Sequence, residues 1–202
     1  MDIEFKTNKK PVNYKKAMDF LVKRVEKVKN GGRELVWILE HPTTYTAGIR
    51  YKKEEILDKS IKIIKTNRGG KITLHNPGQK VVYFVINLNK RKKDIRNLIK
   101  QIEKSIIDFL KVYKISSYSD KKNIGIWVKD KKIAAIGIRV TSWIAYHGFS
   151  INITNDLKDY YKVSPCGLDG SKITSVFNET KNKPNYINKN LKISFFNNLK
   201  KI

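Results

Sequence analysis

Lys132-Ile-Ala-Ala-Ile-Gly-Ile-Arg-Val140 is one of three apolar runs that follow one another closely in the second half of the chain. The run before it is Ile124-Gly-Ile-Trp-Val128, and the run after it is Tyr146-His-Gly-Phe-Ser-Ile-Asn-Ile153. Short apolar runs rich in β-branched and aromatic residues, separated by polar turns, are typical of strands. The three runs predict three strands, of which the first two form a hairpin.

The middle run carries three small residues, Ala134, Ala135 and Gly137. Small side chains weaken strand packing, so their use inside a strand is to let a ligand or another backbone approach closely. This strand is therefore predicted to form one wall of a pocket.

The remaining apolar patterns add helices to the strands. Helical spacing predicts amphipathic helices over 13–29 and 94–113, and two apolar runs, Leu35 to Leu39 and Val81 to Leu88, predict buried strands. From Asn155 to Ile202 we expect short helices around the loop at Cys166 and a Lys-rich amphipathic tail. The pattern predicts an α+β fold, and no internal linker divides it, so we expect residues 1–202 to form a single domain.

The sequence indicates where in the cell the protein is located. The first residues lack the apolar core of a signal peptide, and no run approaches the roughly 18 apolar residues of a membrane span. We therefore expect a cytoplasmic protein with no membrane association, in which the thiol of Cys166 is reduced.

The chain has 43 Lys and Arg residues against 18 Asp and Glu residues, a formal net charge of +25. Positive charge of this size attracts polyanions, which keeps a nucleic-acid-binding protein as one alternative. The excess is nearly all lysine, however, whereas arginine is the better reader of bases. The lysines are also scattered through most segments, which indicates a compositional bias and argues against a dedicated nucleic-acid function.

Side chains that titrate near neutral pH are scarce in this chain. Cys166 is the only cysteine, in Ser164-Pro-Cys-Gly-Leu-Asp-Gly170, and the histidines are His41, His75 and His147. A lone intracellular cysteine is more often a small buried hydrophobic residue than a nucleophile. The proline and glycine that flank Cys166 imply a sharp turn near the surface, where a thiol can meet a substrate. Cys166 is thus a candidate nucleophile.

A second cluster, Arg68-Gly-Gly-Lys-Ile-Thr-Leu-His75-Asn-Pro-Gly-Gln79, precedes the strand that starts at Val81. Adjacent glycines let backbone amides close on an acyl or phosphate oxygen, while Arg68 can hold an anion and His75 can donate a proton. The alternative is an ordinary glycine-rich turn with a satisfied histidine. Neither the P-loop spacing nor GxGxxG is present, so a nucleotide phosphate loop is not supported.

Together these clusters resemble the lipoyl(octanoyl) transferases, which move octanoyl groups from acyl carrier protein to lipoyl domains. The resemblance spans roughly residues 35 to 177, in the order of the family. The matching segments are Glu40-His41-Pro42, Tyr45 to Gly48, Arg68 to Gln79, Gly125 to Val128, Lys132 to Arg139, Trp143, Tyr146 to Phe149, Pro165-Cys166-Gly167 and Thr174-Ser175.

The resemblance implies a fold shared with biotin and lipoate protein ligases, in which a mixed sheet packs with helices. It also implies that Cys166 carries the acyl group as a thioester and that Lys132 lowers the pKa of the thiol. The implied substrate-binding residues are Arg68, Gly69, Gly70, Lys71, Ile72, Thr73, Leu74, His75, Ala135, Ile136, Gly137, Gly148, Phe149 and Ser150. The chain departs from the family pattern at Leu74, usually aromatic, and at Asn76, usually glycine, both of which bear on the shape of the pocket.

The implied chemistry needs no metal and no cofactor. Exchange of one thioester for another is nearly balanced, while amide formation on a lysine is downhill, so the reaction has direction without ATP. The incoming amine must lose a proton, which Lys132 or, as an accessory residue, His147 can accept. The four expected wall residues of the octanoyl slot are Ala134, Ala135, Ile138 and Phe149, and His41 is expected to be structural.

The resemblance also implies the partners. The donor is octanoyl-acyl carrier protein, and the acceptors are lipoyl domains of 2-oxoacid dehydrogenase complexes and the glycine cleavage H protein. These partners are typically acidic, so the net positive charge would steer them to this surface. The nearest alternative is an ATP-dependent lipoate or biotin protein ligase of the same fold, which would not need Cys166.

Overall fold

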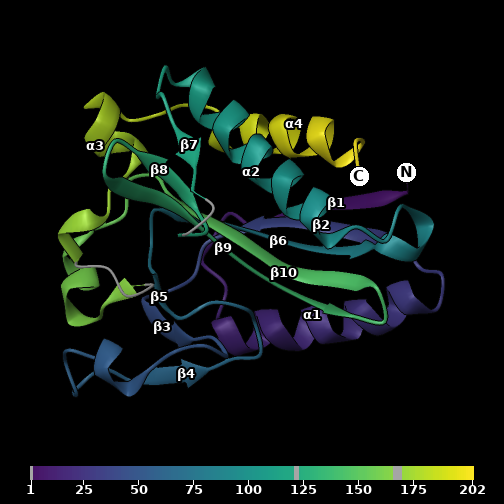
Figure 1. Cartoon of the computed structure of the whole chain (residues 1–202), viewed down its shortest axis with the longest axis horizontal. Helices are drawn as coiled ribbons and strands as arrows, with labels where there is room; N and C mark the ends of the chain where they lie inside the picture. Colours follow the sequence, from purple (N-terminus) through teal and green to yellow (C-terminus); the bar gives the residue numbers. More distant parts are fainter. Residues whose placement is uncertain (1, 121–122, 166–169) are drawn as a thin grey trace.

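A computed structural model, which describes residues 2–120, 123–165 and 170–202, contains a seven-stranded mixed sheet (Figure 1). Its strands, in spatial order, are β1 (Ile3–Thr7), β2 (Glu34–Leu39), β6 (Gln79–Asn87), β10 (Ile144–Asn152), β9 (Lys131–Thr141), β8 (Ile126–Val128) and β7 (Tyr118–Ser119). Only β1 and β2 run parallel to each other, and every other neighbouring pair is antiparallel. The hairpin of β8 and β9 and the strand β10 beside it confirm the three strands expected in the second half of the chain.

A second, three-stranded sheet has the order β4 (Ile63–Lys65), β3 (Thr44–Ala47) and β5 (Ile72–His75). Its strands are short, and Tyr45, Ile72 and Leu74 pack in a separate apolar cluster with residues of the segment after β10. β5 leads directly through a turn into β6 of the large sheet. This connection holds the two sheets against each other.

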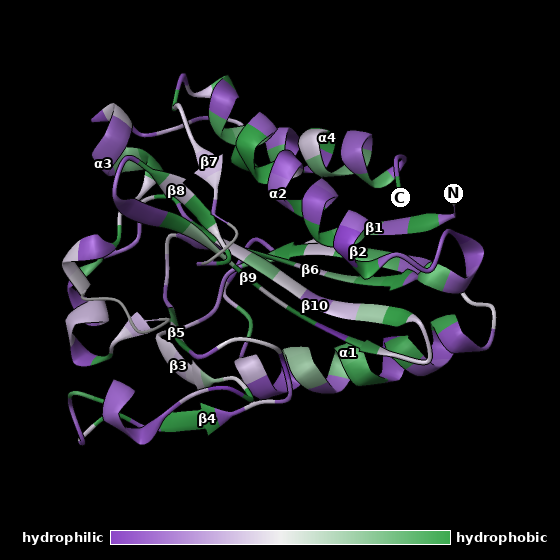
Figure 2. Cartoon of the chain, in the orientation of Figure 1, coloured by the Kyte–Doolittle hydropathy of each residue, from purple (hydrophilic) through white to green (hydrophobic). Residues whose placement is uncertain are grey.

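Helices cover both faces of the large sheet (Figure 1). α1 (Tyr14–Lys29) packs on one face, whereas α2 (Ile95–Val112) and α4 (Ile187–Leu199) pack together on the other. Strand alternation serves both layers, because Leu35 and Trp37 of β2 face α1 while Val36 and Ile38 face α2 and α4. Figure 2 shows hydrophobic and hydrophilic residues interleaved along α1 and α2, as expected for helices with one buried face.

The two long helices begin and end where the sequence predicts. The side chain of Asn13 accepts from the Lys16 amide at 3.2 Å, and that of Asp94 accepts from the Asn97 amide at 2.9 Å, so each residue caps its helix. Apart from α4, the other helices in the described ranges are short: η1 (Lys53–Glu55), η2 (Leu88–Lys90), η3 (Lys158–Lys162), η5 (Gly170–Lys172) and α3 (Val176–Thr180). Within the described ranges no helix is long and apolar enough to cross a membrane.

Candidate active site

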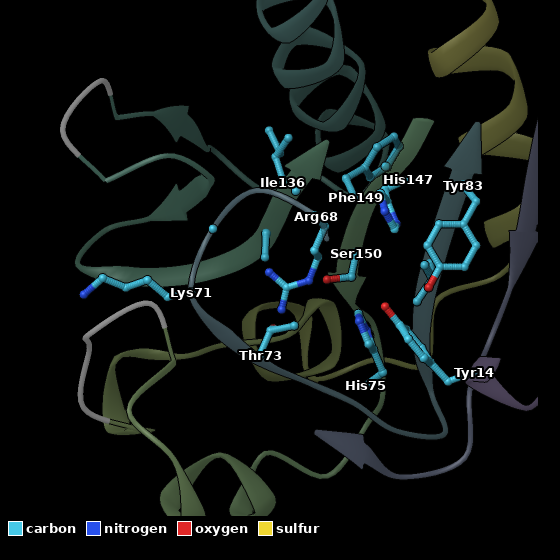
Figure 3. Close-up of a pocket in the computed structure, with 15 residues that line it drawn as sticks. Tyr14, Arg68, Lys71, Thr73, His75, Tyr83, Ile136, His147, Phe149 and Ser150 are labelled. Carbon is cyan, nitrogen blue, oxygen red and sulfur yellow. The ribbon is translucent and has the colours of Figure 1, made fainter. Parts of the chain in front are cut away.

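A cavity lies between β5 of the small sheet and β9 and β10 of the large sheet (Figure 3). It encloses about 480 Å³ of empty space, part of it open to solvent. The lining residues come from α1, the 68–71 loop, β5, β6, β9 and β10, and they are Tyr14, Arg68, Gly70, Lys71, Thr73, His75, Val81, Tyr83, Ala135, Ile136, Gly137, His147, Gly148, Phe149 and Ser150. The structure thus brings most of the predicted substrate-binding residues together, across segments far apart in sequence.

Three residues of that predicted set, Gly69, Ile72 and Leu74, do not line the cavity. Successive side chains of a strand point to opposite faces, so Thr73 and His75 of β5 face the cavity while Ile72 and Leu74 pack into the apolar cluster behind it. The departure from the family pattern at Leu74 therefore lies outside the lining. The amide of Gly69 instead donates to Ile138 O at 3.1 Å and fastens the loop to β9.

The structure places only some of the four expected wall residues at the cavity. Ala135 and Phe149 line the cavity, Ala134 lines a smaller neighbouring cavity, and Ile138 lines neither. Asn76, the other departure from the family pattern, also lies outside the lining, and its side chain donates to Asp156 O at 2.8 Å. Its effect is to tie the turn after β5 to the segment that follows β10.

Three lining residues, Tyr14, Val81 and Tyr83, were missing from the predicted set. Tyr14 is the first residue of α1, where the sequence indicates only the apolar face of a helix. Val81 and Tyr83 belong to a continuous apolar run, in which nothing distinguishes a pocket residue from a core residue. Their role depends on tertiary packing, so the sequence carried no signal for it.

Hydrogen bonds position the polar side chains of the cavity and of the layer behind it. His41 contacts Val12 O through Nδ1 at 2.6 Å and the Tyr83 hydroxyl through Nε2 at 2.9 Å, which is consistent with the structural role expected for this histidine. The Gln79 amide nitrogen donates to Leu74 O and to Asn152 Oδ1, so its oxygen faces His75 Nδ1 at 2.7 Å. His75 therefore carries its proton on Nδ1.

All three histidines are neutral at pH 7. Burial lowers the pKa of His41 to about 4, of His75 to about 3 and of His147 to about 4. For His75 the neighbouring His41 adds to the effect of burial, and for His147 the charges of Arg68 and Arg139 do so. A neutral imidazole costs less to bury beside an apolar ligand than an imidazolium does.

The loop that carries Arg68 is fixed against both sheets. The guanidinium donates to Thr46 O at 3.0 Å, to Thr46 Oγ1 at 2.9 Å and to Gly69 O at 3.0 Å. A Cβ atom on Gly48 would lie 2.5 Å from Gly70 O, so this contact between β3 and the loop requires glycine. The ammonium of Lys71 pairs with Glu55 at 2.7 Å and points away from the other labelled side chains (Figure 3).

A smaller cavity of about 270 Å³, which Lys132 lines, lies beside the first one. The two share Thr73, Ala135 and Ser150 as lining residues. The side chain of Lys132 is buried, its Nζ donates to Ile124 O at 2.7 Å, and it lies 5.7 Å from the centroid of the Trp127 ring. The ammonium is therefore held in place inside the protein, at the smaller of the two neighbouring cavities.

Cys166 lies outside the described residues, as do residues 167–169. Pro165, which precedes Cys166 in the sequence, lines the same small cavity as Lys132. On the other side of the gap, Ile173 forms a bridge with Lys132, and the Thr174 amide donates to Lys132 O at 2.9 Å. The described residues on both sides of the gap thus lie beside Lys132.

His147 lies far from Lys132. It pairs with Ile138 across the two strands, and Ile138 is six residues from Lys132 along β9. At about 3.3 Å per residue, the backbone of Lys132 lies on the order of 20 Å from this pair. Lys132 therefore lies at the cavity that Pro165 lines, and His147 lies far from it.

Gly125 lies against Lys132: its φ is +144°, and a Cβ there would lie 2.2 Å from Lys132 Cε and 2.6 Å from Ala134 O. We expect Gly125→Ala to push the ammonium away and to slow acyl transfer at least about tenfold, equivalent to roughly 1.4 kcal/mol. Gly31→Ala, at a positive φ with nothing within 4 Å of the added Cβ, is the matched control for backbone strain. Steady-state transfer rates of the two variants, with thermal unfolding, check this; equal rates would contradict it.

Comparison with known proteins identifies the family. Residues 13–191 match the model of the lipoyl protein ligase A/B catalytic domain. The chain belongs to this family. A curated relative, the octanoyltransferase of Anaplasma phagocytophilum (strain HZ), is 43% identical over 183 residues, which cover 87% of this chain and 88% of the relative.

Solved structures of two kinds of ligase share the fold. A lipoate-protein ligase A bound with ATP superposes with a TM-score of 0.83 at 14% identity, covering 99% of this chain and 86% of the ligase. A biotin protein ligase from Aquifex aeolicus in complex with biotin and ATP superposes with a TM-score of 0.55 at 13% identity, covering 99% of this chain and 71% of that one. The expected likeness to both kinds of ligase is confirmed at the level of the fold.

Proposed function

We propose that this protein, as a single catalytic domain, transfers an octanoyl group from acyl carrier protein to a lysine of lipoyl domains through a thioester on Cys166. Octanoyl transfer in lipoate biosynthesis is the activity that the family and the octanoyltransferase relatives support. The observation that carries the proposal is the pair of neighbouring cavities, the smaller of which is lined by the buried Lys132, beside residues on either side of Cys166 in sequence.

The first half-reaction forms the acyl-enzyme. The Cys166 thiolate attacks the carbonyl carbon of the octanoyl thioester, and the carrier thiol leaves as the new thioester forms. A free thiol is only a few per cent ionised at neutral pH, and a neighbouring ammonium favours the thiolate. Lys132 is the buried cation that supplies this effect.

The second half-reaction forms the product. The amine of the acceptor lysine attacks the Cys166 thioester, an amide bond forms, and Cys166 leaves as the thiolate. The amine loses a proton in this step, and Lys132 accepts it if it has given its own proton to the departing carrier thiol. Lys132 thereby serves both half-reactions. Cys166 and Lys132 return to the thiolate and ammonium forms in which they began.

The lining of the cavity suits the acyl chain. Burial of each methylene contributes about 0.8 kcal/mol, so a chain of this size gains several kcal/mol in an apolar slot. Ala135, Gly137 and Gly148 line the cavity and carry little or no side chain. A Cβ on Gly148 would lie 1.9 Å from Val82 O, so the narrow contact of β10 with β6 depends on glycine.

The proposed partners follow from the chemistry of donor and acceptor. The donor is octanoyl-acyl carrier protein, and the acceptors are the lipoyl domains of 2-oxoacid dehydrogenase complexes and the glycine cleavage H protein. With a net charge of +25, this chain attracts acidic partners from a distance and speeds their encounter. The attraction weakens as salt is added.

The second candidate function is an ATP-dependent ligase, because solved ligases that hold ATP share this fold. The two functions differ in their donor. We expect the protein to transfer octanoyl from the carrier protein to a lipoyl domain in nucleotide-free buffer, and to leave free octanoate unused with or without ATP and Mg²⁺. Mass spectrometry of the lipoyl domain measures both arms. Modification that requires ATP and consumes the free acid would assign the chain to the ligases.

A further inference from the structure

A second hollow lies on the outer side of the acyl cavity, between α1 and the segment 62–67. This outer groove encloses about 1230 Å³ of empty space, much of it open to solvent, and Met18, Leu21, Val22 and Ile64 give it an apolar floor. Tyr14 and His147 line both the groove and the acyl cavity, and both side chains are buried. These two residues therefore lie between the acyl cavity and a larger apolar space.

The wall is built with some backbone strain. His147 has a φ of +68° in the middle of β10, a conformation that non-glycine residues seldom adopt. Its Nε2 contacts Asn67 Oδ1 at 2.8 Å, and its ring stacks on Tyr146 with 4.8 Å between centroids. Among the residues that the structure describes, its Nδ1 has no hydrogen-bond partner. Strain of this kind persists where the surroundings fix the side chain at a defined place.

The other half of the wall is Tyr14. Its ring stacks on His75 at 6.1 Å between centroids and lies 5.2 Å from the ring of His41. Figure 3 shows Tyr14 and His147 on the same side of Arg68, with Tyr83 nearby. The ring of Tyr14 is thus packed from the cavity side and is held as firmly as the imidazole of His147.

The length of the cavity fits the length of the substrate. Ser150 lines both cavities, and His147 is three residues away along β10, or about 10 Å at 3.3 Å per residue. An extended alkyl chain advances about 1.25 Å per bond for carbon–carbon bonds near 1.5 Å, so an octanoyl group spans roughly 9 Å from its carbonyl carbon to its methyl group. Ser150 lines the small cavity together with Lys132 and Pro165, so a carbonyl held at the level of Ser150, and not beside the Lys132 backbone, places the methyl group against His147.

We propose that Tyr14 and His147 close the distal end of the acyl cavity and limit the transferred chain to about eight carbons. This inference rests on the proposed function and deepens it by assigning its chain-length selection to two residues. Once the wall is removed, a longer chain can continue into the outer groove, where the floor is apolar.

The test measures kcat/KM for octanoyl, decanoyl, dodecanoyl and tetradecanoyl carrier proteins with a lipoyl domain as acceptor. His147→Gly suits the backbone, because glycine adopts a φ of +68° without strain, so this variant should fold. We expect the ratio of dodecanoyl to octanoyl kcat/KM to rise at least about tenfold, since four further methylenes gain apolar contact. Tyr14→Ala opens the wall independently and should change the ratio in the same direction.

Two matched controls separate an open wall from a damaged protein. Tyr14→Phe keeps the ring and should keep the wild-type preference. Val22, whose side chain is 55% exposed in the outer groove, can be replaced by Asp in the His147→Gly background. The added carboxylate should remove the gain for long chains and leave octanoyl transfer as it is in His147→Gly.

The outcomes distinguish this inference from the proposed function. If the wild-type protein transfers no octanoyl group from the carrier protein, the proposed function fails. If it does transfer octanoyl, and both opening variants keep the wild-type chain-length ratio, the inference is overturned. Loss of transfer of every chain in both folded opening variants overturns it as well, because that result would place Tyr14 and His147 in the reacting site.

Discussion

Cys166→Ala is expected to abolish octanoyl transfer, with a loss of at least about 10³-fold, because the acyl group then has no nucleophile to wait on. Intact-mass analysis after mixing with octanoyl-acyl carrier protein should show one added octanoyl group on the wild-type protein and none on the variant. The adduct should be labile to hydroxylamine, as thioesters are.

Cys166→Ser is the matched control, because it preserves size and polarity while offering a weaker nucleophile. It should form little or no adduct in the time in which the wild-type protein is fully acylated. A Cys166→Ala protein that modified a lipoyl domain at the wild-type rate would eliminate the covalent mechanism, whatever the family of the chain.

Lys132→Ala and Lys132→Arg are expected to differ in which half-reaction they lose. A buried fixed positive charge is enough to favour the thiolate, so Lys132→Arg should still form acyl-enzyme at a reduced rate. A guanidinium cannot act as a base in a protein, so transfer to the acceptor amine should fall at least about 10²-fold in this variant, within the range of general base catalysis. Lys132→Ala should lose both steps, and rapid-mix measurement of each half-reaction checks this.

The neighbouring Lys131 provides the control, since it lies on the same strand with its side chain exposed. Lys131→Ala should leave the rates of both half-reactions unchanged. That result would show that removing a lysine from β9 does not by itself impair the enzyme. Wild-type rates in both half-reactions for Lys132→Ala would remove this residue from the mechanism. If Lys132→Arg slowed both half-reactions equally, Lys132 would act only as a positive charge and not as a proton acceptor.

The elements of the fold that could be predicted are the helices and strands whose own residues show a helical or strand pattern. The helix from Tyr14 to Lys29 has a cap, a helical apolar stripe and a glycine stop, and it forms as expected. The strand Ile3–Thr7 was missed, because lysine and glutamate stand between its apolar residues and pairing with β2 decides its state. The three strands of the small sheet are four residues long or shorter, which is too short for a periodic signal.

The residues of the site also divide into those that the sequence could predict and those that it could not. Arg68, His75 and Gly137 could be predicted because charged, titratable and missing side chains stand out within an apolar segment. Tyr14 could not, because its place in the cavity depends on how α1 crosses the large sheet. Cys166 remains a prediction from the sequence, and the structure supports it only through the residues on either side of the undescribed segment.

The strand Ile72–His75 has one face in the apolar cluster and the other in the cavity. Residues next to each other in sequence therefore contribute to different properties of the protein. Replacements at Ile72 or Leu74 act on the free energy of unfolding, whereas replacements at Thr73 or His75 act on what the cavity accepts. Substrate range and thermal tolerance can thus diverge independently among related chains, even within four consecutive residues.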